Sequence, residues 1–290
     1  MDPVGKTAAH DSRHGEEGEP AAGRRSGGLK IVITGASSGL GYALALEFAG
    51  RFPDSTLLLL GRREERLKEL ALRLPAGTRS CCETVDVSDH LAMKAVAERF
   101  LHQEGLPDIV IASAGISAGT LTDEPEDRAV FARVFAVNVQ GMYDTFAPFV
   151  GAMKQAGRGT LVGIASVAGV RGLPGSGAYS GSKAAVSAYL ESLRVELHGS
   201  GVSVVTISPG FIDTEMTRGN PYRMPFLMPV DQFARRAVDA ILGRRRRIVI
   251  PWQMGCVAIL LRVLPAWLFD RLFAGAGRKP RQPGLGRSSG

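Results

Sequence analysis

Seven short apolar segments, separated by stretches with helical spacing, constrain this chain more than any other feature. The apolar segments lie near residues 29–35, 56–61, 80–87, 108–115, 159–166, 201–210 and 247–251. The helical stretches between them are roughly 39–51, 63–74, 88–104, 125–155, 177–199 and 230–242. This alternation predicts an α/β fold, in which a mostly parallel seven-stranded sheet is covered by helices on both faces. The alternative is a flavodoxin-like α/β fold, which would have fewer strands.

The chain of 290 residues is predicted to form one domain, a doubly wound (Rossmann) unit over residues 29–251. Residues 1–28 offer almost nothing to bury and are expected to be disordered. They contain no apolar run typical of a secretory signal, so we expect a protein that is not secreted. Residues 252–290 are expected to form an apolar helix with basic flanks, followed by a disordered tail.

The three cysteines are Cys81, Cys82 and Cys256, and two of them are adjacent. This spacing gives neither a disulfide framework nor a set of metal ligands, so no metal is expected. A reducing compartment fits best. We therefore expect a cytoplasmic location, with the cytoplasmic face of a membrane as the alternative site.

The net charge of +7 is concentrated at the C-terminal end. From Gly243 onward there are ten Lys and Arg residues and one acid, Asp270. The rest of the chain holds 25 bases and 27 acids, a net charge of −2. This distribution argues against a nucleic-acid-binding surface and favours contact between the tail and anionic lipid.

A glycine-rich turn, TGASSGLG at residues 34–41, follows the first predicted strand and leads into a helix. Such a turn lets backbone N–H groups approach a pyrophosphate at the positive end of a helix. The spacing of Gly35, Gly39 and Gly41 differs from the commoner dinucleotide pattern, and glycine turns can also serve the backbone alone. Its place between strand and helix favours nucleotide binding.

The end of the second strand bears on the choice of nucleotide. A carboxylate there usually binds a free ribose 2′-hydroxyl, but here the strand ends in Gly61, Arg62 and Arg63. A guanidinium at Arg62 suits a 2′-phosphate, which favours NADP(H) over NAD(H); Arg63 fits better as a solvated residue that opens a helix. Asp86 and Val87 end the third strand near the expected adenine, although Asp86 could instead cap the next helix.

Four further residues complete a pattern that resembles the short-chain dehydrogenase/reductase family. Ser166 ends the fifth strand, Tyr179 and Lys183 lie four residues apart in AYSGSKA, and Asn138 lies in the long preceding helix. With TGASSGLG, these motifs cover about residues 29–251. Two of these residues also have a structural interpretation, since Ser166 could cap a turn and Asn138 could bond a helix carbonyl.

The chemistry explains these residue types. Carbonyl reduction needs a proton on oxygen, and the ordinary tyrosine pKa of about 10 is too high for facile exchange. A nearby ammonium favours the phenolate, so we expect Lys183 to lower the pKa of Tyr179, the general acid/base. Ser166 would stabilise charge on the substrate oxygen. The resemblance further implies that Lys183 binds the nicotinamide ribose and that Asn138 holds a proton-relaying water.

The resemblance also extends to PGFIDT at residues 209–214, where Pro209 and Gly210 end the sixth strand and Ile212 to Thr214 are expected along the nicotinamide carboxamide. One departure is Ser113-Ala114-Gly115, where the family commonly has Asn-Ala-Gly. The predicted catalytic residues are Ser166, Tyr179, Lys183 and Asn138. The predicted cofactor-binding residues are Gly35, Ser37, Ser38, Gly39, Leu40, Gly41, Arg62, Asp86, Val87, Ser113, Ala114, Gly115, Tyr179, Lys183, Pro209, Gly210, Ile212 and Thr214.

Two apolar segments bear on substrate and partners. Residues 215–229 include Met216, Tyr222, Met224, Phe226, Leu227 and Met228. They are expected to line the site of a hydrophobic, lipid-like carbonyl or alcohol substrate, or else to pack on the core or another subunit. Residues 254–269 carry one charge, Arg262, and are too short to span a bilayer, but residues 252–275 suit a peripheral membrane contact, with packing on the core or a second subunit as alternatives.

The resemblance implies a homodimer or tetramer and an enzyme acting on CH–OH groups. The leading hypothesis is therefore an NADP(H)-dependent oxidoreductase. The alternatives are a catalytically weak nucleotide-binding regulator, which would be expected to lack Tyr179 or Lys183, and a membrane scaffold, which leaves both unexplained.

Overall fold

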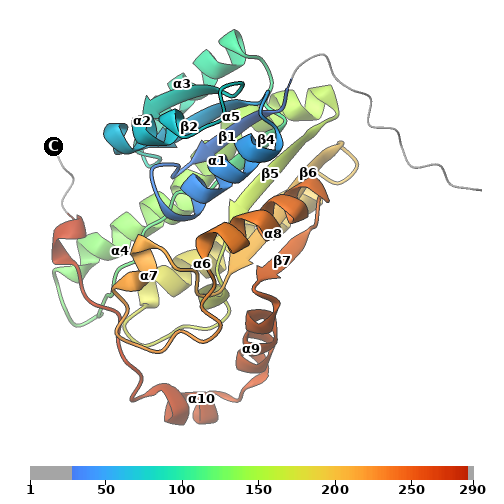
Figure 1. Ribbon diagram of the computed structural model, residues 1–290. Helices are drawn as coiled ribbons and strands as arrows, with labels where there is room; N and C mark the ends of the chain where they lie inside the picture. The colour runs from blue at the N-terminus through green and yellow to red at the C-terminus, as the bar shows by residue number, and fades with distance from the viewer. Residues whose placement is uncertain (1–27, 287–290) are drawn as a thin grey trace, which may run out of the picture.

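A computed structural model describes residues 28–286 of the chain. Its centre is a seven-stranded parallel sheet in the order β3-β2-β1-β4-β5-β6-β7, which confirms the predicted doubly wound fold (Figure 1). The strands are β1 Lys30–Thr34, β2 Thr56–Gly61, β3 Arg79–Thr84, β4 Ile109–Ala112, β5 Gly159–Ile164, β6 Val202–Pro209 and β7 Arg247–Ile250. The expected disorder of residues 1–28 falls, except for Gly28, outside the described residues.

Helices cover both faces of the sheet. Successive side chains of a strand point to opposite faces, and since the central strands are mainly apolar, both faces need to be shielded from water. On one face, Ile31 and Ile33 pack against α1, α2 and α8; on the other, Val32 packs against α3, α5 and α6. The helices of these layers are α1 Gly39–Arg51, α2 Glu64–Leu72, α3 His90–Gln103, α5 Gly141–Ala156, α6 Gly177–Glu196 and α8 Val230–Leu242. The central strands are buried on both faces, which explains their continuous apolar sequences.

The predicted helix over 125–155 is divided into three parts. It consists of α4 Asp127–Phe135, a π-helical turn η1 Ala136–Gln140, and α5. The apolar period runs through the turn almost unbroken, so the sequence pattern does not reveal it. The π turn carries Asn138, and such turns often occur at functional sites.

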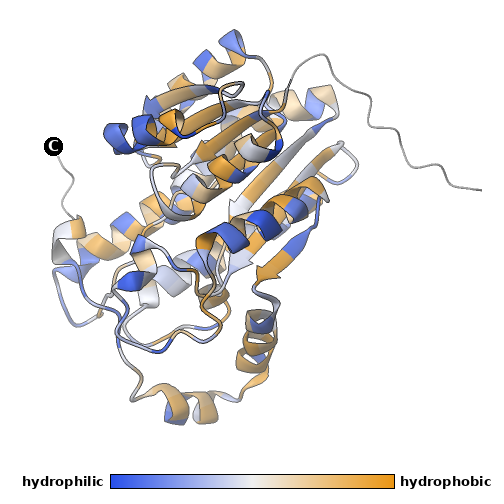
Figure 2. Cartoon of the chain, viewed as in Figure 1, coloured by the Kyte–Doolittle hydropathy of each residue, from blue (hydrophilic) through white to orange (hydrophobic). Residues whose placement is uncertain are grey.

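After β7 the chain leaves the sheet and returns. It forms α9 Trp252–Val263 and α10 Ala266–Phe273, two apolar helices below the sheet (Figures 1 and 2). It then runs back to α4, where a 3₁₀ turn, η3 Pro283–Gly286, ends the described chain. Within residues 28–286, no helix has both the length and the apolar character needed to cross a bilayer.

Candidate active site

The loops at the carboxyl ends of the strands form one cleft, where parallel sheets of this topology bind ligands. The strand order places β2 on one side of β1 and β4 on the other, so the connections diverge at this point. Every predicted cofactor-binding residue lines the cleft, and so does Ser166. Asn138 lies behind it, fully buried. The structure thus brings together residues that are up to 179 positions apart, from Gly35 to Thr214.

Close backbone approach explains two glycines of the turn after β1. Gly35 has a φ of +70°, and a Cβ there would lie 2.8 Å from Cα of Ala114 in the turn after β4. A Cβ on Gly41 would lie 2.5 Å from the carbonyl oxygen of Gly35. Any side chain at these positions would push α1 and the neighbouring loop apart, so glycine keeps the helix start close to the cleft.

The polar groups in the turns after β1 and β4 fit a bound nucleotide. Ser38 is the N-cap residue of α1 but forms no side-chain capping bond, so the helix start faces the cleft without a side-chain cap. Thr34 Oγ1 accepts the N–H groups of Ser113 and Ala114, at 3.2 and 3.3 Å. Ser113 Oγ is buried and has no hydrogen-bond partner among the described residues. A nucleotide phosphate would suit the start of α1, and a donor or acceptor group of the nucleotide would satisfy Ser113 Oγ.

The cation expected to select the nucleotide has an acidic neighbour. Arg62 is 58% exposed, and its Nη1 lies 3.8 Å from Oδ2 of Asp86. Arg133 of α4 donates to the same carboxylate. Sequence reasoning missed Arg133, because nothing in its helix marks it as a residue of the site. Arg62 therefore shares Asp86 with a second cation, and this leaves it available to a phosphate.

Asp86 is not the helix cap. Asp89 caps α3 by accepting the N–H of Ala92 at 3.0 Å, whereas Asp86 Oδ1 accepts the N–H and hydroxyl of Ser88. Burial acts to raise the pKa of Asp86, but the bonds from Ser88 and Arg133 outweigh it and leave the pKa below its ordinary value. The carboxylate therefore stays charged at neutral pH and interacts with both arginines, whose combined charge it only partly neutralises.

Arg63 also lines the cleft, and it has partners of its own. It pairs with Glu215 at 3.3 Å and donates to the carbonyl oxygen of Ser37 at 3.4 Å. The guanidinium thus links the turn after β1 to the segment after β6. This contact gives Arg63 a structural role across the mouth of the cleft.

Ser166 and Lys183 lie at the end of β5. Ser166 caps the 3₁₀ turn η2 Val167–Gly169, and its Oγ accepts the N–H of Ala168 at 3.1 Å, as in the structural alternative stated above. Lys183 is buried, and its Nζ donates to the carbonyl oxygen of Ile164 at 2.8 Å. The same Nζ lies 6.0 Å from the ring centroid of Tyr179. The three side chains therefore meet at one end of the cleft.

Burial shifts both partners of the Tyr179 and Lys183 pair. It raises the pKa of Tyr179 above its ordinary value, and an interaction with the Ser166 hydroxyl opposes this rise. It lowers the pKa of Lys183 to about 8. The direction for Tyr179 is opposite to the expected effect of Lys183, because withdrawal of the phenol from water disfavours its anion. The protein groups by themselves therefore keep Tyr179 protonated at neutral pH.

Asn138 is held by three hydrogen bonds. Its Oδ1 accepts the N–H of Ile116 at 2.8 Å, and its Nδ2 donates to the carbonyl oxygen of Ile116 at 3.0 Å and to Ser182 Oγ at 2.9 Å. A Cβ on Gly115 would lie 3.3 Å from Asn138 Oδ1. The amide thus clamps the turn after β4 against α6, and its expected part in proton relay stays a prediction.

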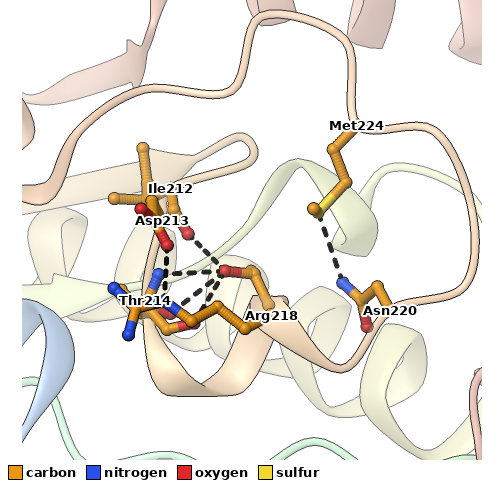
Figure 3. A network of polar contacts seen from close by, with 7 residues as sticks. Ile212, Asp213, Thr214, Arg218, Asn220 and Met224 are labelled. Atoms are coloured by element: carbon orange, nitrogen blue, oxygen red, sulfur yellow. Dashed lines mark hydrogen bonds and ion pairs between the residues drawn. The ribbon is translucent and has the colours of Figure 1, made fainter.

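The segment after β6 folds over the cleft through a small polar network (Figure 3). Thr217 Oγ1 donates to the carbonyl oxygen of Ile212 at 2.6 Å and accepts the N–H of Thr214 at 3.0 Å. Arg218 pairs with Asp213 at 2.9 Å. These bonds form the short helix α7 Glu215–Arg218 and fix the backbone beside the predicted nicotinamide contacts.

The apolar residues expected to line the substrate site separate into different environments. Met216 lines the cleft, whereas Met228 is buried in the core and bridges to Ile212. Phe226 and Leu227 are about half exposed. Met224 accepts a hydrogen bond from Asn220 at 3.7 Å (Figure 3). Tyr222 lies against Phe211, with ring centroids 6.3 Å apart.

The fold and the cleft define the class of an NAD(P)-dependent oxidoreductase, and comparison with known proteins gives the family. Residues 30–223 match the family model described as short chain dehydrogenase. An uncharacterized oxidoreductase of Myxococcus xanthus is 37% identical over 243 residues, which are 82% of this chain and 94% of the relative. The chain therefore belongs to the short-chain dehydrogenase family and is an NAD(P)-dependent dehydrogenase acting on CH–OH groups.

Two solved structures are similar to the fold. One is a short chain dehydrogenase/reductase from Burkholderia phymatum in complex with NAD, with 26% identity, a TM-score of 0.72, and coverage of 89% of this chain and 98% of that one. The other is an alcohol dehydrogenase from Thermococcus sibiricus complexed with 5-hydroxy-NADP, with 26% identity, a TM-score of 0.67, and coverage of 77% and 95%. Neighbours of this fold thus include complexes with both kinds of nicotinamide nucleotide.

Proposed function

We propose that the chain interconverts a hydrophobic ketone and its secondary alcohol with NADP(H), using Tyr179 as the general acid/base. The observation that carries the proposal is the meeting of Ser166, Tyr179 and Lys183 at one end of the cleft whose other walls include the glycine turn. A tyrosine kept protonated by burial suits the donation of a proton to a carbonyl oxygen.

In this proposal the bound cofactor supplies the hydride, and the side chains handle the proton and the charge. The hydroxyl groups of Ser166 and Tyr179 donate hydrogen bonds to the substrate oxygen, and Tyr179 passes its proton to that oxygen in reduction. The Lys183 ammonium then stabilises the resulting phenolate. Lys183 would also hold the nicotinamide ribose, and Asn138 would keep the turn after β4 in place.

The preference for NADP(H) rests on Arg62. Its guanidinium is exposed at the cleft, and its nearest carboxylate, Asp86, is already bonded to Arg133 and Ser88. A 2′-phosphate would gain a charge-assisted bond from Arg62. A free 2′-hydroxyl would gain less, because the end of β2 carries no carboxylate of its own.

The proposed substrate is apolar around its carbonyl group. Met216 and Ile116 border the cleft near Tyr179, and Tyr222 lies close enough to act on the pKa of Tyr179. Methionine and aromatic side chains suit an adaptable apolar pocket. These residues favour a hydrophobic ketone over a sugar.

We further propose that α9 and α10 contact a membrane surface peripherally. Both helices expose large apolar side chains, and Figure 2 shows both helices as mainly hydrophobic. The exposed residues are Trp252, Ile259, Leu260, Val263, Trp267 and Leu272. Arg262 and Arg271 on the same helices favour anionic lipid. The alternative occupant is a second copy in the proposed homodimer or tetramer.

The test of the proposed activity is NADPH oxidation by the full-length protein over a panel of hydrophobic ketones. We expect turnover with some of these ketones and, in reverse, NADP⁺ reduction with the matching alcohols. NADPH binding without turnover of any ketone or alcohol would contradict the proposal and favour a nucleotide-binding regulator.

A further inference from the structure

The C-terminal end of the described chain is fastened across the edge of the active site. We call residues 278–281 the strap. The N–H of Gly119 donates to the carbonyl oxygen of Pro280 at 2.9 Å, and Gly119 and Arg281 form a parallel bridge. Arg281 pairs with Asp127 at 2.9 Å and with Glu124 at 3.0 Å. Since the Asp127 side chain is only 2% exposed, this anchor is well protected from solvent.

The strap lies among the chain segments that surround Tyr179. Gly277, directly before it, lies beside Tyr222, since a Cβ there would be 3.6 Å from Tyr222 Cβ. Arg278 packs on Gly175, two residues before α6 begins, and Gly119 belongs to the connection after β4. The strap thus touches the connection after β4 and the segment before α6, and the preceding Gly277 touches the segment after β6.

The ammonium group of Lys279, a residue of the strap, lies beside the ring of Tyr179. Its Nζ donates to Ser117 Oγ at 2.6 Å and lies 5.5 Å from the ring centroid of Tyr179. Among residues 28–286, no carboxylate lies within 4.0 Å of this ammonium, because the nearby acids Glu124 and Asp127 pair with Arg281. Burial lowers the pKa of Lys279 to about 8.

A half-buried ammonium without an anion is unfavourable for the fold, since one neutral hydroxyl and one aromatic ring only partly replace its lost hydration. Lys183, the other ammonium beside Tyr179, is bonded to a backbone carbonyl and lines the nucleotide cleft. Lys279 reaches the same ring from the strap, next to Ser117, which is two residues beyond the cleft-lining Gly115. Its position suits a ligand that extends from Tyr179 away from the nucleotide.

We propose that Lys279 is a specificity-determining residue, whose ammonium receives an anionic oxygen group of the substrate. The ketone would therefore have an apolar body and a carboxylate or similar acid group. The strap completes the substrate end of the site. This inference rests on the proposed oxidoreductase activity and adds the charge of its substrate.

The test compares an apolar keto acid with its methyl ester, which share the reacting carbonyl and differ in charge. For the wild type we expect a higher kcat/KM with the acid. Lys279→Met should lower the kcat/KM of the acid by about 10- to 100-fold, mainly through KM, as expected for loss of a charge-assisted bond. The ester should change little, and Lys279→Arg should retain part of the preference.

A second variant tests the strap without altering Lys279. A Cβ on Gly119 would lie 2.1 Å from the carbonyl oxygen of Lys279, so Gly119→Ala should displace the strap and reduce the preference for the acid. The control is Gly172→Ala, since a Cβ at Gly172 meets no heavy atom within 4 Å. We expect the control to keep the wild-type preference.

The outcomes separate this inference from the proposed function. The pair is therefore built on a ketone that the wild type reduces in the panel described above; if no ketone of that panel, charged or neutral, is reduced, the proposed activity fails. If both are reduced and the acid is not preferred, or if Lys279→Met and Gly119→Ala keep the preference, the role of Lys279 is wrong.

Discussion

At the scale of single residues, burial sets the pKa values of the proposed catalytic pair, Tyr179 and Lys183. The sequence suggests that an ammonium four residues from a phenol lowers the phenol's pKa. In the structure both groups are withdrawn from water, so the pKa of Tyr179 rises and that of Lys183 falls to about 8. Sequence spacing predicts which side chains share a helix face, but it does not give the depth at which they lie.

The first prediction concerns pH and a neutral ketone. Lys183 is charged below its pKa of about 8, and Tyr179 keeps its proton well above neutral pH. Reduction needs the proton on Tyr179 and the charge on Lys183, so kcat/KM should be level from about pH 6 to 8 and fall above it. Steady-state rates across this range provide the measurement.

Lys279 serves as the control for that profile, because its pKa is also lowered to about 8. The alkaline fall with a neutral ketone should persist in Lys279→Met. A profile that stays level beyond pH 9 in the wild type, or a fall that disappears in Lys279→Met, would exclude Lys183 as its origin.

The second prediction concerns cofactor choice. Arg62→Ala should weaken NADPH binding by about 1.5–3 kcal/mol, the range for a lost charge-assisted hydrogen bond, and leave NADH binding nearly unchanged. Dissociation constants from fluorescence titration give both values. The matched control is Arg66→Ala, since Arg66 is exposed on the neighbouring helix and pairs only with Glu69 among the described residues. Equal losses for both nucleotides would remove Arg62 from this role.

At the scale of elements, the seven strands and most helices could be predicted, because each carries a local pattern of apolar residues. Two features could not. The π turn around Asn138 hardly changes the apolar period of its helix, and the return of residues 278–286 to α4 depends on the tertiary pairing of Arg281 with Asp127. Arg133 and Lys279 were missed for the same reason, since their partners are distant in the sequence.

The third prediction belongs to the turn between β1 and α1. Gly41→Ala should destabilise the fold by about 1–3 kcal/mol and weaken nucleotide binding, because its Cβ would lie 2.5 Å from the Gly35 carbonyl oxygen. Chemical unfolding and nucleotide titration measure the two effects. Gly50→Ala in the same helix is the control, since a Cβ there meets nothing within 4 Å. A neutral Gly41→Ala would contradict the close approach.

At the scale of the whole molecule, the C-terminal region has two distinct parts. Helices α9 and α10 expose apolar side chains, whereas the strap beyond them is tied to the active-site edge. Arg171 links α9 and α10 to the body of the protein by donating to the carbonyl oxygens of Leu261 and Leu264 and by lying 4.4 Å from the Phe269 ring centroid.

The fourth prediction concerns this apolar surface. Full-length protein should sediment with vesicles containing anionic lipid, and the double variant Trp252→Ser/Trp267→Ser should sediment less. Leu72→Ser/Leu91→Ser is the control, because these exposed residues lie on α2 and α3. If the wild type does not sediment and the tryptophan variant changes the oligomer size instead, α9 and α10 contact a second copy.

The most direct test of the central claim, that Tyr179 transfers the proton in this cleft, measures turnover and NADPH binding in the same variant. Tyr179→Phe should lower ketone reduction by about 10²-fold or more while the NADPH dissociation constant stays close to that of the wild type. Tyr189→Phe, on the same helix, should retain activity. Wild-type turnover in Tyr179→Phe would contradict the assignment.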